Sequence, residues 1–189
     1  MVRIRGFFFD LDGTLVDTHE SNYMAYRKAI DSVMGIELGD ELKIAIKAGE
    51  NSNSFIPRLT KNASSSQVEL INQMKKEIYP LCLDASKSND FLIEFLRHMG
   101  ESYTTVLVTT AKRNNALSVL AKHNLDDLFD YTVFGDEITD MKPSPAAYNL
   151  ALAKTGLNPE EVLAFEDSEN GITSAELAGI RAVHIRDFL

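Results

Sequence analysis

The sequence has 189 residues and a mass of 21.0 kDa, enough for one core domain and a small additional unit. Hydrophobic residues make up 44% and charged residues 25%, so the composition argues against disordered, collagen-like and coiled-coil chains. The net charge of −9 argues against nucleic acid and anionic membranes as partners, and the single cysteine, Cys82, excludes an intrachain disulfide. With no apolar run near the ~18 residues of a membrane span and no signal-peptide pattern at the start, we expect a cytoplasmic protein.

The first predicted strand is the apolar run at residues 4–9, and the next such run begins only at residue 106. A β-α-β crossover takes about 30 residues, so this interval contains an inserted unit. Helical patterns occur within it at residues 18–33, 41–47, 53–59 and 67–79, the first opened by Asp17 and Glu20 at capping-box spacing. We predict a helical domain at residues 16–87 inserted into a core formed by residues 1–15 and 88–189.

Beyond the insertion, apolar runs alternate with helical patterns. Strands are predicted at residues 106–109, 131–134, 162–165 and 182–185, and helices at 114–123, 145–155 and 172–178. Ser144 before Pro145 has the pattern of an N-cap followed by a first-turn proline, and residues 158–161 predict a short acidic turn. The alternation predicts an α/β fold with a Rossmann-like parallel sheet covered by helices.

The most specific local motif is Asp10-Leu11-Asp12-Gly13-Thr14, which directly follows the first predicted strand. Two carboxylates this close repel each other unless a cation or a chemical task holds them. The carboxyl ends of parallel strands are where open α/β sheets bind ligands, and carboxylate oxygens suit Mg²⁺. Gly13 permits a sharp turn, and a divalent cation would keep Asp10 ionised as a nucleophile.

Polar groups also follow the later predicted strands. Thr109 and Thr110 end the second strand, Lys142 follows the third, and Glu166-Asp167 follow the fourth. Each of these residues alone is weak evidence for a functional site, because each also has an ordinary structural explanation. Threonines are common in strands, a lysine is usually solvated, and an acidic pair can cap a helix. Because such strand ends converge in a parallel sheet, their joint occurrence predicts one site.

With these motifs the sequence resembles the haloacid dehalogenase superfamily, in the phosphatase branch with a small helical cap after the first strand. The resemblance covers nearly the whole chain and implies that Asp10 attacks phosphorus to form an aspartyl-phosphate. Asp12 would protonate the leaving oxygen and then activate water. Mg²⁺ would be held by Asp10, the main-chain carbonyl of Asp12 and Asp167, with Glu166 nearby in an outer shell.

The same resemblance assigns the phosphoryl-binding groups. Thr109 and the backbone after it would bind phosphoryl oxygens, with Thr110 as the alternative one residue on. Lys142 would offset charge on the phosphoryl group and on Asp10. Gly13 and Thr14, in the turn after the first strand, are further candidates for substrate contacts.

In the predicted cap, the segment around Gly49 is the candidate loop for substrate selection, against the alternative of an ordinary turn. Lys47 lies near the place where a phosphonatase of this superfamily carries its Schiff-base lysine, although a solvated lysine is the simpler interpretation. A mutase of the superfamily has a histidine where this chain has Asn22 and an arginine near the position of Asn51, and these differences argue against mutase activity. One further departure is Ser88-Asn89-Asp90-Phe91, where relatives often carry a Pro-Gly pair.

The sequence therefore predicts a Mg²⁺-dependent phosphatase that hydrolyses a small phosphorylated metabolite, as a monomer or weak homodimer. A phosphomutase and a phosphonatase are the alternatives within the superfamily. A regulatory protein that is phosphorylated on Asp10 is the alternative from another class, although such a receiver has no use for a long helical insertion.

Overall fold

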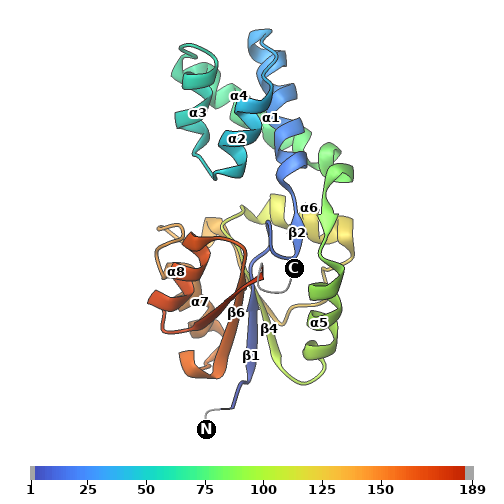
Figure 1. Cartoon of the computed structure of the whole chain (residues 1–189), viewed down its shortest axis with the longest axis vertical. Coiled ribbons are helices and arrows are strands. Elements are labelled where there is room, and N and C mark those ends of the chain that lie inside the picture. The colour runs from blue at the N-terminus through green and yellow to red at the C-terminus, as the bar shows by residue number, and fades with distance from the viewer. Residues whose placement is uncertain (1–2, 186–189) are drawn as a thin grey trace. The chain divides into compact units, whose positions relative to one another are not determined.

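The computed structural model describes residues 3–185 of the chain, so residues 1, 2 and 186–189 of the predicted core lie outside the described residues (Figure 1). The chain divides into two compact units. The core unit comprises the residues up to Asp17 and those from Ser88 onward, and the helical unit comprises Thr18–Lys87. Two short strands, β2 (Val16–Asp17) and β3 (Lys87–Ser88), pair with each other where the chain passes between the units.

The core unit contains a five-stranded parallel sheet, which confirms the predicted fold class. Its strand order is β5-β4-β1-β6-β7, and every pair of neighbours is parallel. The strands are β1 (Gly6–Phe9), β4 (Thr104–Val108), β5 (Tyr131–Val133), β6 (Val162–Glu166) and β7 (Arg181–His184).

Strand β1 lies in the middle of the sheet, between β4 and β6. Phe8 is in register with Val106 on one side and with Ala164 on the other. The chain runs from β1 through β4 to the edge strand β5 and then returns to the other side of β1, so the strand order reverses there. Ligands of open parallel sheets bind at the carboxyl ends of strands next to such a reversal.

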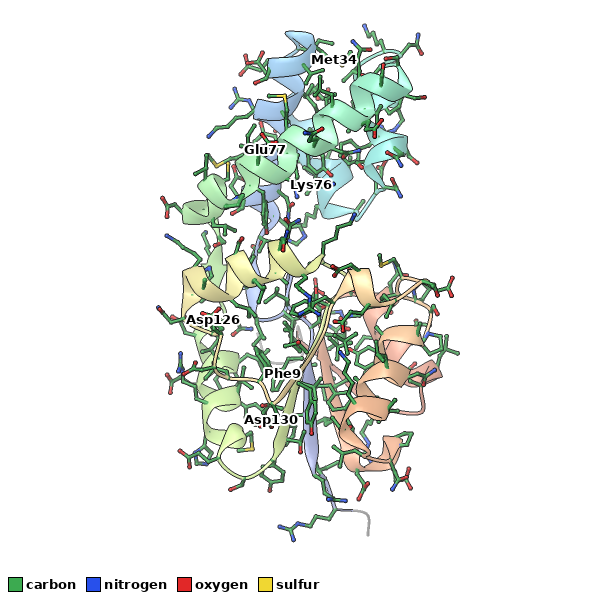
Figure 2. The ribbon with its side chains drawn as sticks, turned by 180° about the vertical axis from the view of Figure 1, so that it is seen from behind. Phe9, Met34, Lys76, Glu77, Asp126 and Asp130 are labelled. Atoms are coloured by element: carbon green, nitrogen blue, oxygen red, sulfur yellow. The ribbon has the colours of Figure 1, made fainter. Side chains whose placement is uncertain are left out.

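Side chains of β1 alternate between two apolar layers, because successive residues of a strand point to opposite faces. Phe8 packs in a buried cluster with residues of the helices on one face, including Tyr148. Phe9 stacks on Phe165 with ring centroids 5.0 Å apart, and both rings also meet Phe95 on the other face. Figure 2 shows Phe9 among the side chains that fill the sheet region of the core unit.

Helices cover both faces of the sheet. They are α5 (Asp90–Gly100), α6 (Arg113–His123), α7 (Ala146–Thr155) and α8 (Glu169–Leu177), and the short 3₁₀ turns η2 (Gly135–Glu137) and η3 (Pro159–Glu161) occur in the loops. In Figure 1, α5 lies on one side of the sheet, and α7 and α8 lie on the other. The predicted helices of this region and the acidic turn at 158–161 are confirmed, within a few residues at their ends.

Three local predictions were wrong or incomplete. Thr18, rather than Asp17, is the N-cap residue of helix α1 (His19–Met34), so the capping box expected from Asp17 and Glu20 does not open that helix. Helix α7 begins at Ala146 with Pro145 as its N-cap, one residue later than predicted. Helix α5 was not predicted; the Asn89 side chain caps it by accepting a hydrogen bond from the Leu92 N–H.

The helical unit packs around its own apolar cluster. Its elements are α1 (His19–Met34), α2 (Asp40–Lys47), α3 (Ser52–Leu59), α4 (Ser65–Ile78) and the 3₁₀ segment η1 (Tyr79–Ala85). Phe55, Ile56 and Ile71 are almost fully buried in this cluster with Ile30. No helix among the described residues is long and apolar enough to cross a membrane.

Candidate active site

The turn after β1 presents the first two candidate carboxylates. Asp10 is 7% exposed, and its backbone N–H donates to the carbonyl of Phe165 on β6 at 3.1 Å. The carbonyl of Leu11 then accepts hydrogen bonds from the N–H groups of residues 14, 15 and 16, which closes the turn tightly. Asp12 is half-buried within this turn and forms a β-bridge with Val16.

Gly13 is required in the turn on two grounds. Its φ of +92° lies in the region that L side chains rarely adopt. A Cβ atom at this position would also lie 2.2 Å from Oδ2 of Asp167. The absence of a side chain therefore lets the Asp167 carboxylate, at the end of β6, pack directly against the turn that carries Asp12.

The ammonium group of Lys142 connects the ends of three strands. Its Nζ atom donates to Oδ1 of Asp10 at 2.7 Å, to the carbonyl of Val108 at 2.9 Å and to Oε1 of Glu166 at 2.6 Å. The side chains of Lys142, Asp10 and Glu166 are 6%, 9% and 1% exposed. The loop after Lys142 is held to α8, because the Ser174 hydroxyl donates to the Ser144 carbonyl at 2.6 Å.

Burial and charge act in opposite directions on this cluster. Burial disfavours the charged form of Lys142, but the Asp10 and Glu166 carboxylates outweigh it and raise the pKa of Lys142 above its ordinary value. Burial, together with the neighbouring Asp10 carboxylate, raises the pKa of Glu166, although Lys142 opposes this shift. Lys142 is therefore protonated, and the Asp10 and Glu166 carboxylates share its single positive charge.

Tyr148 on α7 is a member of the site that the sequence did not reveal. Its hydroxyl donates to Oε1 of Glu166 at 2.5 Å, and the side chain is fully buried. Burial, followed by the charge of Glu166, raises the pKa of Tyr148 well above its ordinary value, so the phenol stays protonated. In the sequence Tyr148 fits the apolar face of a predicted helix, and nothing in that pattern shows where its hydroxyl points.

The carboxylates of Asp10, Glu166 and Asp167 form a group that fits a divalent cation. One oxygen from each lies within 4.8 Å of the others. When these three residues are ionised and Lys142 is protonated, the group carries an excess of two negative charges. Carboxylate oxygens are hard donors, and a group of them with two excess negative charges suits Mg²⁺. Oε1 of Glu166 already accepts from Lys142 and Tyr148, which favours Asp10 and Asp167 as direct ligands.

Thr109 and Thr110 follow β4 and differ in exposure. Thr109 is 1% exposed; its hydroxyl accepts from the Ala111 N–H at 3.0 Å, and its own N–H donates to the Val133 carbonyl. Thr110 is exposed. The loop after Thr109 lies against Gly135, where a Cβ atom would come within 2.1 Å of the Thr110 carbonyl oxygen.

Asn89 is a second residue that the sequence did not point to. Its side-chain amide donates to the Thr14 carbonyl at 3.2 Å, and its backbone N–H donates to the Leu15 carbonyl at 2.8 Å. It therefore ties the return of the chain from the helical unit to the turn after β1. The Thr14 hydroxyl is buried in that turn and has no hydrogen-bond partner among residues 3–185.

The start of α8 completes the site. Ser168 is its N-cap and accepts from the Gly171 N–H at 3.1 Å, so the Glu166-Asp167 pair does not cap this helix. A Cβ atom on Gly171 would lie 2.0 Å from Oε2 of Glu166. Glu166 is therefore enclosed by Lys142 and Tyr148 at one oxygen and by the backbone of Gly171 at the other.

The candidate residues of the predicted cap all belong to the helical unit. Lys47 is the last residue of α2, and Gly49, with φ of +68°, lies in the loop before α3. The Asn51 side chain caps α3 by accepting from the Asn53 N–H, and the Asn22 side chain donates to the Thr18 carbonyl. Lys47 and Gly49 remain predictions as substrate contacts.

Comparison with known proteins gives matches over almost the whole chain. The sequence profile described as "Haloacid dehalogenase-like hydrolase" matches residues 7–185. The phosphorylated carbohydrates phosphatase of Thermotoga maritima is 28% identical, with 93% of this chain and 82% of that protein covered. The phosphoglycolate phosphatase of Pectobacterium atrosepticum is also 28% identical, over 97% of this chain and 80% of that one. The crystal structure of beta-phosphoglucomutase from Clostridium difficile superimposes with a TM-score of 0.77 at 25% identity, over 96% and 84% of the two chains.

Proposed function

The chain belongs to the haloacid dehalogenase-like hydrolase family, and from this we propose that it is a phosphatase acting on a small phosphomonoester through an aspartyl-phosphate on Asp10. The observation that carries the proposal is the cluster at the carboxyl ends of β1, β4 and β6. There Lys142 bonds both Asp10 and Glu166, and the Asp167 carboxylate lies against Gly13. The Lys142 ammonium group therefore holds the Asp10 carboxylate in place at the strand end, as a positioned nucleophile requires.

In the first step, an oxygen of Asp10 would attack phosphorus while the bond from phosphorus to the ester oxygen breaks. Asp12 would donate a proton to that leaving oxygen, so the alcohol departs neutral. In the second step, Asp12 would take a proton from water as the water oxygen attacks the aspartyl-phosphate. Inorganic phosphate then leaves, and the Asp10 carboxylate is regenerated. The placement of Asp12 in the tight turn two residues after Asp10 supports this double role.

The donor set also supports Mg²⁺ as the cofactor. Asp10 and Asp167 would hold the ion, together with the main-chain carbonyl of Asp12, and Glu166 would support them from behind. When bound, Mg²⁺ would neutralise negative charge on the phosphoryl oxygens and keep Asp10 ionised. This chain's own residues supply the rest: Thr109 and the N–H groups after it would bind phosphoryl oxygens.

We propose that the helical unit is the cap that selects the substrate, with the segment around Gly49 as a contact. The substrate would be a small phosphorylated metabolite of the sugar-phosphate or phosphoglycolate kind. Support comes from relatives that are named as phosphatases of phosphorylated carbohydrates and of phosphoglycolate. A protein with these properties would act in the cytoplasm without nucleic-acid partners.

Phosphomutase activity is the second candidate, because a beta-phosphoglucomutase is among the similar structures. Against it, the chain has asparagines at the two places discussed above: the Asn22 side chain bonds the Thr18 carbonyl at the start of α1, and the Asn51 side chain caps α3. A mutase would release an isomerised sugar phosphate. A phosphonatase would instead form a borohydride-trappable adduct on Lys47, and a regulatory protein would keep a long-lived phosphoaspartate without turnover.

The deciding experiment measures phosphate release from sugar phosphates, phosphoglycolate, nucleotides and an aryl phosphate, with Mg²⁺ and with a chelator. We expect release that depends on Mg²⁺ and ranks the substrates. Asp10→Asn should abolish turnover while the protein remains folded, because the amide is a far weaker nucleophile. Turnover by a folded Asp10→Asn variant would refute the mechanism. Phosphate release unaffected by the chelator would refute the cofactor assignment.

A further inference from the structure

The hydroxyl of Tyr148 lies at the inner end of a chain of hydrogen bonds that leads to Asp10. It donates to Oε1 of Glu166 at 2.5 Å, and that same oxygen accepts from Lys142 at 2.6 Å. Lys142 in turn donates to Asp10 at 2.7 Å. The Tyr148 hydroxyl is therefore linked to the proposed nucleophile through two other side chains, while the Tyr148 ring lies 5.3 Å from the Lys142 ammonium group. All four side chains are nine-tenths or more buried.

We propose that Tyr148 is a positioning residue, which fixes the Glu166 carboxylate so that Lys142 stays on Asp10 and the acidic group keeps its geometry for a cation. This inference rests on the proposed function and adds to it a residue outside the motifs of the sequence. Within residues 3–185, the only other hydrogen-bond partner of the Glu166 side chain is Lys142. Lys142 bonds only one of its oxygens, and the other faces the bare backbone of Gly171.

The hydroxyl has a role separate from that of the ring. The ring of Tyr148 is 0% exposed and packs in the apolar cluster with Phe8, Val108 and Ala164. A phenylalanine ring fills the same space, so packing alone does not call for a hydroxyl. Buried hydroxyl groups are costly unless they are hydrogen-bonded, and the partner of this hydroxyl within the described part of the chain is a carboxylate of the site.

The test is Tyr148→Phe in the full-length chain, with Tyr103→Phe as the matched control. Tyr103 lies in the same unit just before β4, and its ring packs edge-on against Phe7, away from the candidate site. For Tyr148→Phe we expect kcat to fall about tenfold with KM nearly unchanged, the range for loss of a hydrogen bond to a charged group. Mg²⁺ binding without substrate, measured by calorimetry, should weaken by about tenfold, as for other residues that support metal ligands. The control should change neither.

Four outcomes bear on the proposal. A Tyr148→Phe protein with wild-type kcat and Mg²⁺ affinity would overturn it. Loss of folding in Tyr148→Phe, seen by circular dichroism, would also overturn it, because the ring is assigned the packing role and is retained. Equal losses in kcat and affinity in Tyr103→Phe would likewise overturn it, because they would show a general effect of removing a tyrosine hydroxyl. If the wild-type protein hydrolyses no substrate, the proposed function fails, while the calorimetric comparison still decides the positioning role.

Discussion

Replacing Gly171 by alanine sets helix propensity against the geometry of the site. Gly171 lies in the first turn of α8, and its backbone is not in the left-handed region. In a helix, alanine is more favourable than glycine by about 0.8–1.0 kcal/mol, so propensity alone predicts a more stable protein. The added Cβ would lie 2.0 Å from Oε2 and 2.2 Å from Cδ of Glu166.

The clash outweighs the propensity gain. Side-chain contacts of a Cβ atom essentially never fall below 3.0 Å, so Glu166 must move by about 1 Å from its 2.0 Å separation. Its bonds to Tyr148 and Lys142, now 2.5 and 2.6 Å, would then lengthen to about 3.5 Å, where hydrogen bonding is lost. Overpacking of this kind costs about 1–3 kcal/mol. After the propensity gain of about 0.8–1.0 kcal/mol is subtracted, the middle of that range leaves a net loss of about 1 kcal/mol. For a chain of this size that lowers Tm by about 2–4 °C.

The assay compares Gly171→Ala with Gly100→Ala, a glycine at the end of α5 where an added Cβ meets only Thr105 Cγ2 at 3.8 Å. We expect Gly100→Ala to be slightly stabilised, by about 0.5–1 kcal/mol, and fully active. Gly171→Ala should be less stable than the wild type in urea unfolding and should lose at least about 100-fold in kcat, since it displaces a carboxylate of the site. The reasoning is refuted if Gly171→Ala is as stable as Gly100→Ala and retains wild-type kcat.

Two further predictions concern charged groups. Lys142→Met should lower kcat at least about 100-fold, because Asp10 and Glu166 lose their buried cation. For the same reason it should destabilise the protein by about 3–5 kcal/mol, measured by chemical denaturation. A variant with wild-type stability would contradict this prediction. At the surface, burial opposes ionisation of Glu137, but hydrogen bonds led by that from Lys154 outweigh it and lower the pKa of Glu137. Its charge therefore stabilises the fold above the unfolded value of about 4.3, and this contribution is lost as the pH falls through the lower folded value. Glu137→Gln should be about 0.5–1 kcal/mol less stable at pH 7, and urea unfolding at several pH values should show the two proteins converging in acid.

Much of the arrangement of the site could be predicted from the sequence pattern. Asp10, Thr109 and Glu166 each stand at the end of an apolar run, and parallel strands bring their carboxyl ends to one edge of the sheet. Lys142 is 132 residues away from Asp10 in the chain, yet its position after the third predicted strand predicts that it lies with the other site residues. The role of Gly13 could be predicted for the same reason, since it lies where the chain must turn after the strand.

The features that were missed depend on which way a side chain points. Tyr148 has the spacing of a core residue, and its ring does lie in the core. The hydrophobic pattern of the sequence therefore cannot show that its hydroxyl bonds Glu166. Asn89 was noticed only as a departure from relatives, whereas its two hydrogen bonds to the turn after β1 arise from tertiary contact. The start of α1 was misread because Asp17 and Glu20 have the right spacing for a capping box, but Asp17 belongs to β2.

The hydrogen bonds of Lys142 limit what this residue can do for a substrate. An ammonium group has three protons, and those of Lys142 go to Asp10, to Glu166 and to the carbonyl of Val108. Because every donor is engaged, Lys142 would act on a phosphoryl group through its charge and would leave direct hydrogen bonding to other groups, such as the N–H groups after Thr109. The bond to Val108 also explains why the site needs β4 beside β1: it fixes the ammonium group at the end of one strand while the carboxylates come from the two others.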